Sequence, residues 1–428
     1  MNIVIAIIIF GILIITHELG HFLMARAVGV GVVEFSVGFG PKIISREHNG
    51  TMYSLRVVPF GGYCAMIGEN EDSDADDALS NKSPLQRMLV LLGGPMFNFI
   101  TALILCALIV CFGGADVPKA VLVDEKYGAY AAGIRDGDII RSIDGSSIGL
   151  GKDIDLSLVL KDLTDGEVTV EYERDGEIST AVIDPAYKTW LIGISYSATD
   201  EAATISAVNP DYPAAEAGLE VGDVIVAVNG NPVSSGSEMR TFMEGLTLDG
   251  TPISLTYSRN GVEKEVTVEP RPYTGYYIGF ESGYTHEKVG FFGVIKNTFL
   301  EFGYWIRYVF TSLRMILTGK VGLSDMSGPV GIVAIIGSTV EQSMSDGILY
   351  VILNLMTIAA LLASNLGVFN LLPLPALDGG QLMIALIELV SRRKIPEQGK
   401  GIINTIGLTF WMAVMGLILF SDVWKMIR

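Results

Sequence analysis

The chain has 428 residues, of which 50% are hydrophobic and 18% are charged, and its mean hydropathy is +0.46. This apolar excess excludes a disordered chain and disfavours an ordinary soluble enzyme. The formal net charge of −18 argues against a nucleic-acid-binding protein. Residues 114–290 hold 13 Lys and Arg against 30 Asp and Glu, whereas the rest of the chain is nearly neutral, so we expect an acidic soluble block between membrane segments.

The chain begins with an apolar segment, residues 1–28, that predicts a transmembrane helix. It could be taken for a signal peptide, but the basic residues that precede the apolar run of such a peptide are missing, so we interpret it as a retained span. Further apolar segments at 88–113 and 400–421 each predict one more helix, and residues 347–382 predict another transmembrane helix together with the motif Leu377-Asp378-Gly379. Each is long enough to cross the roughly 30 Å hydrocarbon core of a bilayer.

Residues 29–70, after the first span, predict a β region. Val32–Val37 and Met52–Val58 have strand character, and Asn49-Gly50 between them is typical of a turn. Residues 71–87 are predicted to be an acidic cytosolic linker. The short loops between spans one and two and between spans three and four are rich in Lys and Arg, which predicts that both loops lie in the cytosol. The acidic block and both termini are then outside.

The acidic block contains an internal repeat with an offset of 85 residues. Ala132-Gly133-Ile134-Arg135-Asp136-Gly137-Asp138 matches Ala217-Gly218-Leu219-Glu220-Val221-Gly222-Asp223. A repeat of this length predicts two copies of one fold, at 114–187 and 188–273. The shared pattern resembles a PDZ domain, which implies two α/β modules that bind extended peptides or exclude bulky substrates. Residues 285–322 follow as an amphipathic, aromatic segment that predicts a helix on the membrane surface.

The first predicted span contains His17-Glu18-Leu19-Gly20-His21. On a helix, residues i and i+4 share a face, so the two imidazoles can hold one zinc ion while Glu18 reaches its water. Ionisable groups inside a span are costly and are usually functional. The alternative is a polar patch that forms hydrogen bonds between helices. Gly20 would allow a close approach of a second helix.

A catalytic zinc site needs a third protein ligand. His48 and His286 are poor candidates, because both are expected to be solvated. The better candidate is Asp378, a carboxylate in an apolar stretch without a basic residue between Lys320 and Arg392. It is expected at the cytosolic end of its span, as are the two histidines. The alternative for Asp378 is a helix cap before Gly379-Gly380.

Together these features resemble the site-2 protease family of intramembrane zinc metalloproteases, in the bacterial form with paired PDZ domains. The family signatures are HExxH, here His17–His21, and LDG, here Leu377-Asp378-Gly379. The resemblance implies one zinc ion held by His17, His21 and Asp378, with Glu18 as the base. Gln381 departs from the His that relatives often have after LDGG, at a position that is not a ligand in the family.

The resemblance also implies where substrate binds. It assigns this role to the β region around Gly38, Phe39 and Gly40, whose alternative is a cytosolic hairpin with glycine turns. Near Asp378, polar and helix-breaking residues interrupt the third span, and we predict substrate contacts there, most directly at Asn370; the set is Asn365, Asn370, Pro373 and Pro375. Local helix repair and packing is the alternative for these four.

We therefore predict a multi-pass α-helical membrane protein with four transmembrane helices, a membrane-associated β region and two extracytoplasmic PDZ-like domains. The resemblance implies cleavage of transmembrane segments in the bacterial inner membrane, on single-pass anti-sigma factors or signal-peptide remnants. The PDZ-like domains could also bind peptides, and no nucleic acid is expected. Two alternatives are a non-catalytic membrane scaffold with a structural metal and a zinc transporter. Glu18 disfavours the first, and the two peptide-binding modules disfavour the second.

Overall fold

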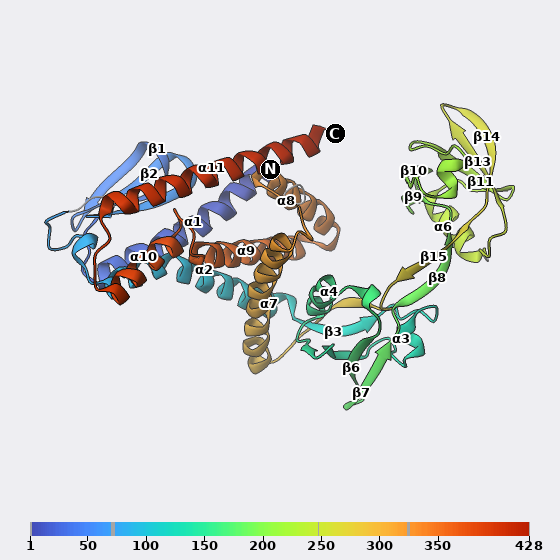
Figure 1. Ribbon diagram of the computed structural model, residues 1–428, viewed down its shortest axis with the longest axis horizontal. Helices are drawn as coiled ribbons and strands as arrows, with labels where there is room; N and C mark the ends of the chain where they lie inside the picture. The colour runs from blue at the N-terminus through green and yellow to red at the C-terminus, as the bar shows by residue number, and fades with distance from the viewer. Residues whose placement is uncertain (1, 70–72, 247, 323–325, 428) are drawn as a thin grey trace. The chain divides into compact units, whose positions relative to one another are not determined.

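The computed structural model describes residues 2–69, 73–246, 248–322 and 326–427 (Figure 1). The chain forms two compact units. The membrane unit consists of Met1–Pro118, Gly149–Leu160 and Tyr284–Arg428, and the repeat unit of Lys119–Ile148 and Lys161–Gly283.

Four helices of the described residues are long and apolar enough to cross a membrane: α1 (Asn2–Ala27), α2 (Pro84–Gly113), α9 (Ile348–Leu371) and α11 (Glu397–Ile427). They confirm the four predicted spans in length and composition. Large apolar side chains such as Ile12, Ile104 and Ile406 are exposed along them. Lipid contact accounts for these exposed side chains, because a soluble protein would bury such rows.

Further helices complete the membrane unit. They are η1 (Leu79–Asn81), α4 (Gly151–Leu160), α7 (Phe291–Leu317), α8 (Pro329–Ser343), η4 (Met344–Asp346) and α10 (Asp378–Ser391). Helix α7 lies within the predicted surface segment and exposes Phe291, Phe292 and Phe299. Helix α8 was not predicted, although Pro329 at its first position is a usual start signal.

The region predicted as the third span with its LDG motif, 347–382, contains one helix and the start of a second in the structure. Helix α9 ends at Leu371, and α10 starts at Asp378. Pro373 cannot donate a helical hydrogen bond, and it disfavours a helical conformation of Leu372, whose ψ is 140°. The break places Asp378 at the first turn of a new helix and not inside a span.

Helices α1 and α2 approach each other closely at glycines. A Cβ atom on Gly20 would lie 2.1 Å from the carbonyl oxygen of Gly93, so any side chain there would push the two backbones apart. On the other side, a Cβ atom on Gly94 would lie 2.4 Å from Nε2 of His21. The close approach expected of Gly20 is therefore present, and it seats the histidine face of α1 against the backbone of α2.

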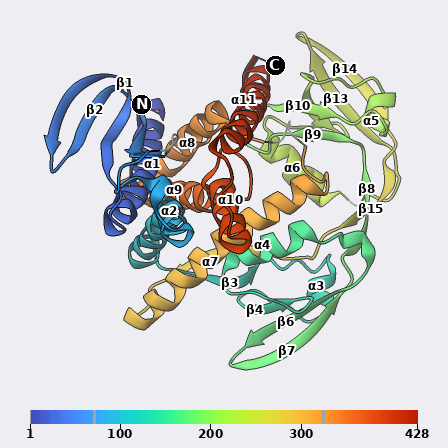
Figure 2. The ribbon, with the colours of Figure 1, turned by 60° about the vertical axis from the view of Figure 1, so that its left-hand side comes forward.

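Strands β1 (Val32–His48) and β2 (Thr51–Met66) form an antiparallel pair beside α1 (Figure 2). Strand β2 bends around its partner: Glu34 pairs with both Met52 and Ala65. The segment 32–37 therefore lies between two parts of β2. The outer part, 62–66, pairs with no second strand among the described residues, so it is a free edge.

The repeat unit contains the second copy of the repeat and most of the first, whose residues 114–118 and Gly149–Leu160 belong to the membrane unit. One sheet has the order β16-β3-β4-β6-β7 with β5 on β4, the other has β14-β13-β11-β10-β9 with β12 on β11, and β8 pairs with β15. Strand β16 follows the second copy in sequence, so residues beyond 273 complete the sheet of the first copy. The strands are β3 (Ala115–Val121), β4 (Ile139–Ile143), β5 (Ser146–Ser147), β6 (Val168–Arg174), β7 (Glu177–Ile183), β8 (Ala186–Leu191), β9 (Ile194–Tyr196), β10 (Ala203–Val208), β11 (Val224–Val228), β12 (Asn231–Pro232), β13 (Ile253–Arg259), β14 (Val262–Val268), β15 (Arg271–Tyr276) and β16 (Glu281–Glu287).

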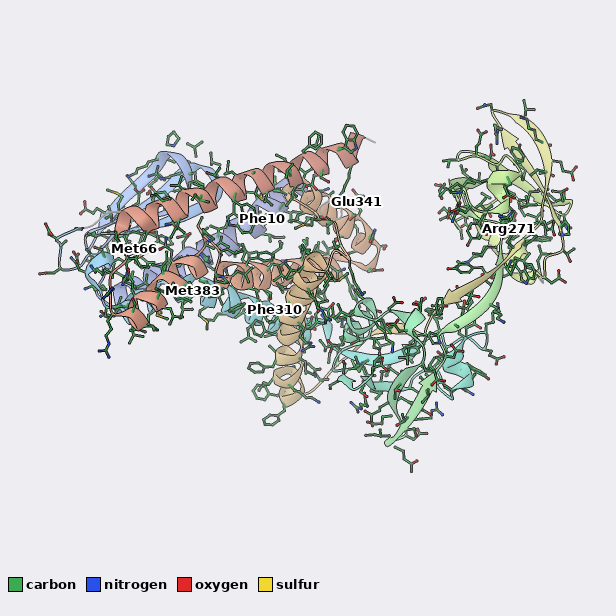
Figure 3. All side chains as sticks on the ribbon, in the orientation of Figure 1. Phe10, Met66, Arg271, Phe310, Glu341 and Met383 are labelled. Carbon is green, nitrogen blue, oxygen red and sulfur yellow. The ribbon has the colours of Figure 1, made fainter. Side chains whose placement is uncertain are left out.

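The two copies share their internal contacts as well as their sequence. In each, an arginine at the end of a strand makes hydrogen bonds to a buried aspartate: Arg174 to Asp138 and Arg259 to Asp223. Both pairs are related by the 85-residue offset. Short helices also recur at the 85-residue offset: α3 (Gly128–Ala131) corresponds to α5 (Pro213–Glu216), and α4 corresponds to α6 (Gly236–Gly245), whereas η2 (Leu163–Asp165) occurs in the first copy. Arg271 on β15, which is labelled in Figure 3, makes a further ion pair with Glu216, at 2.6 Å.

Candidate active site

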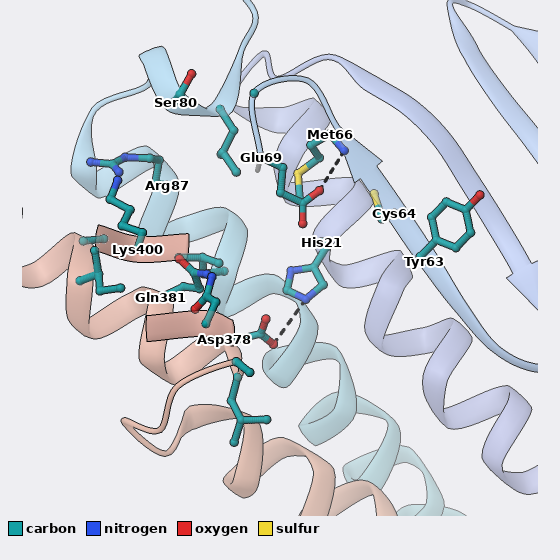
Figure 4. Close-up of a pocket in the computed structure, with 18 of the residues that line it drawn as sticks. His21, Tyr63, Cys64, Met66, Glu69, Ser80, Arg87, Asp378, Gln381 and Lys400 are labelled. Atoms are coloured by element: carbon teal, nitrogen blue, oxygen red, sulfur yellow. Dashed lines mark hydrogen bonds and ion pairs between the residues drawn. The ribbon is translucent and has the colours of Figure 1, made fainter. Parts of the chain in front are cut away.

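Three side chains from two distant parts of the sequence converge in the membrane unit. His17 and His21 lie on one face of α1, as their spacing predicts, and Asp378 lies at the start of α10. Oδ2 of Asp378 is 3.2 Å from Nε2 of His17 and 3.4 Å from Nε2 of His21. The two Nε2 atoms are 3.1 Å apart. Figure 4 shows His21 and Asp378 facing each other across the gap between their helices.

This triangle of donor atoms has the size of one face of a tetrahedral zinc site. Ligand distances of about 2.0–2.1 Å place neighbouring ligands of a tetrahedron about 3.3–3.4 Å apart. The three observed separations lie close to that value. Oδ2 of Asp378 is buried and makes no well-aligned hydrogen bond. Two imidazoles and one carboxylate are also a usual ligand set of catalytic zinc, so the residues fit the metal.

Helix α2 orients both imidazoles. Nδ1 of His21 lies 2.9 Å from the carbonyl oxygen of Val90, and Nδ1 of His17 lies 3.1 Å from the amide of Asn98. Asn98 is fully buried. Sequence reasoning did not select Asn98, although a polar residue within a predicted span was a usable signal.

A cavity of about 550 Å³ opens beside the three ligand atoms. Its wall contains Glu18 and the edge residues Tyr63, Cys64 and Met66, together with Gln381 of α10 (Figure 4). Glu69 also lines it and accepts a hydrogen bond from the backbone N–H of Met66. The cavity gives water and a peptide a place next to the ligands, which a hydrolytic site within a membrane requires.

The free edge of β2 lies next to Glu18. A Cβ atom on Gly62 would be 3.8 Å from Cγ of Glu18. Phe39 stacks on Tyr63 of the edge with ring centroids 6.3 Å apart. The structure thus brings the predicted Gly38-Phe39-Gly40 segment to the strand that lines the cavity, although these three residues do not line it themselves.

Arg56 fixes that segment from the middle of the β region. Its guanidinium donates to Oε1 of Glu34 at 2.8 Å, to the carbonyl oxygen of Gly40 at 2.6 Å and to the hydroxyl of Tyr63 at 2.6 Å. Gly38 and Gly40 have φ of 87° and 85°, which favours glycine at both positions. Arg56 therefore connects Gly40, Glu34 in the segment 32–37 and Tyr63 on the edge at the cavity.

The four residues near Asp378 that were predicted to contact substrate are not among the described residues that line the cavity. Asn365 and Asn370 are in α9, and neither lines the cavity in the described part of the chain. Pro373 lies in the break between α9 and α10. Pro375 packs against α11: a Cβ atom on Gly407 would be 2.4 Å from Cβ of Pro375, and the carbonyl oxygen of Pro375 accepts a hydrogen bond from Trp411.

A buried ion-pair cluster joins α2, α10 and α11 near the cavity. Glu388 of α10 pairs with Arg87 of α2 and, at 3.1 Å, with Lys400 of α11. It also accepts a hydrogen bond from the backbone N–H of Ile395. Arg87 and Lys400 both line the cavity. This carboxylate has two cationic partners, unlike Asp378.

Comparison with known proteins places these features in context. The model of peptidase family M50 matches residues 5–414. Zinc metalloprotease RasP of Geobacillus kaustophilus is 30% identical over 436 residues, which span 98% of this chain and 97% of RasP. Regulator of sigma-E protease RseP of Salmonella typhimurium is 30% identical over 451 residues, 98% of each chain. The HtrA3 PDZ domain bound to a phage-derived ligand covers 21% of this chain and 92% of its own, with 22% identity and a TM-score of 0.18, which is too low to support a fold assignment.

Proposed function

The chain belongs to peptidase family M50, and from that premise we propose that His17, His21 and Asp378 hold one catalytic zinc ion and that Glu18 is the base. Family membership makes the chain a zinc-dependent intramembrane endopeptidase. The observation that supports the residue assignment is the convergence of two Nε2 atoms and one carboxylate oxygen at the edge of a cavity that also contains Glu18.

The proposed chemistry uses few groups. Zinc in the site supplies a Lewis acid that acidifies a water and stabilises negative charge on a peptide carbonyl oxygen. Glu18 accepts a proton from the attacking water and returns it to the nitrogen of the leaving amine, so that water is divided between the two products. The two histidines and Asp378 stay deprotonated at their ligand atoms.

The proposed substrate path follows the edge of β2. A transmembrane helix has its backbone groups bonded internally, so its scissile carbonyl becomes accessible only after local unwinding. An unwound segment can pair as a strand with residues 62–66, next to Glu18. The loop of Gly38, Phe39 and Gly40 supports that edge through Tyr63. Substrate contacts of Asn365 and Asn370 stay a prediction, and we assign Pro373 and Pro375 to the helix break before Asp378.

We further propose single-pass membrane proteins as substrates: anti-sigma factors, which the name of the sigma-E relative suggests, or signal-peptide remnants. The lysines and arginines of the short loops support an orientation in the bacterial inner membrane with the repeats and both termini outside. In this orientation the PDZ-like repeats, at 114–187 and 188–273, bind peptides or exclude bulky ectodomains, and the acidic segment 71–87 is cytosolic.

The test is Glu18→Gln, with zinc content and cleavage of a reporter transmembrane substrate measured in detergent. We expect the variant to keep its zinc and lose cleavage, because the ligands are intact and the base is gone. Glu341→Gln, an exposed carboxylate of α8, is the matched control and should cleave as the wild type does. Undiminished cleavage by Glu18→Gln would refute the role of Glu18, and a wild type without cleavage would favour the scaffold.

A further inference from the structure

Asn98 is a polar residue in the span α2 whose side chain is fully buried. Its amide lies 3.1 Å from Nδ1 of His17. The other ring nitrogen of His17, Nε2, faces His21 and Asp378 at the proposed zinc site. The amide therefore contacts the proposed ligand on the side opposite to the metal.

The position of the proton on the His17 ring determines which atom of the Asn98 amide can lie next to Nδ1. A neutral imidazole that gives the lone pair of Nε2 to a metal carries its proton on Nδ1. The group 3.1 Å from Nδ1 must then accept a hydrogen bond, and the only acceptor in an asparagine amide is Oδ1. In the structure, Nδ2 is the nearer atom. A half turn about Cβ–Cγ exchanges the two atoms and moves nothing else.

This half turn adds no unpaired group to the protein interior. Oδ1 of Asn98 is buried without a hydrogen-bond partner among the described residues. After the turn, Nδ2 takes that place, so one amide atom is unpaired in either orientation. The turn replaces a contact between two donors, Nδ2 of Asn98 and Nδ1–H of His17, with a hydrogen bond. It is therefore favoured when Nε2 of His17 is free to bind a metal.

The second histidine provides an internal comparison. Nδ1 of His21 already lies 2.9 Å from the carbonyl oxygen of Val90, which can only accept. Val90 and Asn98 are both on α2, and Gly94 between them allows the close approach of the two rings. Helix α2 thus presents one acceptor to each imidazole.

We infer that Asn98 is a positioning residue whose Oδ1 accepts the Nδ1–H of His17 and holds Nε2 toward the metal. The inference rests on the proposed zinc site. A histidine ligand commonly donates its second ring N–H to a carboxylate or carbonyl oxygen, and loss of that partner typically weakens metal binding about 10–100-fold. The role is distinct from helix packing, because it depends on an acceptor atom and not on side-chain volume.

The experiment compares Asn98→Leu with Asn98→Asp in the full-length protein, and measures zinc affinity by competition with a chelator. Leu keeps the branching at Cγ without an acceptor, so zinc binding should weaken about 10–100-fold. Asp restores an acceptor oxygen and should keep zinc affinity near that of the wild type. Asn354→Ala is the matched control, because this asparagine of α9 donates to Ser343 at 2.7 Å and should leave zinc affinity unchanged.

Wild-type zinc affinity in Asn98→Leu would overturn the inference and leave the zinc site intact. Equal weakening in the Leu and Asp variants would also overturn it, because the acceptor would then not matter. If Asn98→Leu does not fold, Asn98→Ala takes its place, with the same expectation. A wild type without stoichiometric zinc would refute the proposed site itself, and that result is separate from the other outcomes.

Discussion

Buried carboxylates have different partners in the two units. In the repeat unit, Asp138 and Asp223 are 2% and 1% exposed, and each accepts two hydrogen bonds from an arginine. In the membrane unit, Asp378 faces two imidazole nitrogens, and no described Lys or Arg forms an ion pair with it. A carboxylate with a cation fixed in the chain is structural. A carboxylate that shares a gap with two imidazole nitrogens is arranged for a cation from solution.

The membrane unit contains both kinds of carboxylate, so depth in the protein does not explain the difference. Glu388 is 3% exposed and has Arg87 and Lys400 as partners. It connects three helices, whereas Asp378 completes a ligand set. The comparison can be tested by removing partners in each region and measuring zinc content, activity and stability separately.

The largest expected effect is that of His21→Ala. It removes one of the three proposed ligands, so cleavage of a reporter substrate should fall by at least about 10³-fold, the scale seen when a core catalytic group is lost. His286→Ala, at an exposed histidine, is the control and should cleave normally. A His21→Ala variant that keeps more than roughly a tenth of the wild-type rate would contradict the ligand assignment.

Glu388→Gln should act on stability and not on zinc. Loss of the carboxylate leaves Arg87 and Lys400 with less compensation in a buried site, which typically costs about 3–5 kcal/mol. We expect this loss in the free energy of unfolding, measured by denaturant titration in detergent, while zinc content stays at the wild-type level. A change within about 0.5 kcal/mol, as at ordinary surface positions, would show that the cluster is not structural.

Arg56→Met should weaken substrate binding while the zinc site stays loaded. The apolar stem is retained, but the hydrogen bonds to Glu34, Gly40 and Tyr63 are lost. Small displacements of positioning residues cost up to about 10²-fold, and we expect a roughly tenfold higher KM. Arg46→Met, at an exposed position of β1, is the control. Equal KM values for the two variants would argue against the role of Arg56.

The smallest effect concerns pH and the repeat unit. Hydrogen bonds from Arg259 hold the pKa of Asp223 below its usual range. The unfolded chain then binds the proton more readily, so this stabilisation is present above the unfolded pKa of about 3.9 and is lost as pH falls through the lower folded value. Hydrogen exchange of β11 and β13 should differ between wild type and Asp223→Asn at pH 7, and this difference should shrink below about pH 4. A constant difference would contradict the prediction.

Much of the architecture follows from short-range patterns. Apolar runs predict the four spans, the i, i+4 spacing predicts the histidine face of α1, and the 85-residue offset predicts paired copies. Two features depend on long-range packing, which sequence does not encode locally. Helix α8 has the moderately apolar composition of either a helix or a loop. The closure of the first sheet by β16 requires a strand from beyond the second copy.

The site was only partly predictable for the same reason. His17, Glu18, His21 and Asp378 carry local signals, namely a motif and an isolated carboxylate. Asn98 and Arg56 act through contacts with residues 81 and 16 positions away, at His17 and Gly40, and the spacing of neighbours in sequence does not reveal such contacts. Asn365 and Asn370 show the converse: a polar residue near the motif need not line the cavity.

The most direct test of the distinction between a metal-binding and a structural carboxylate is the zinc content of Asp378→Ala and Asp223→Ala. It is measured on purified full-length protein by atomic emission. Both substitutions remove a buried aspartate, but only Asp378 is assigned to the metal. We expect one zinc per chain in the wild type and in Asp223→Ala, and a loss of zinc in Asp378→Ala. Full zinc occupancy in Asp378→Ala would contradict the account.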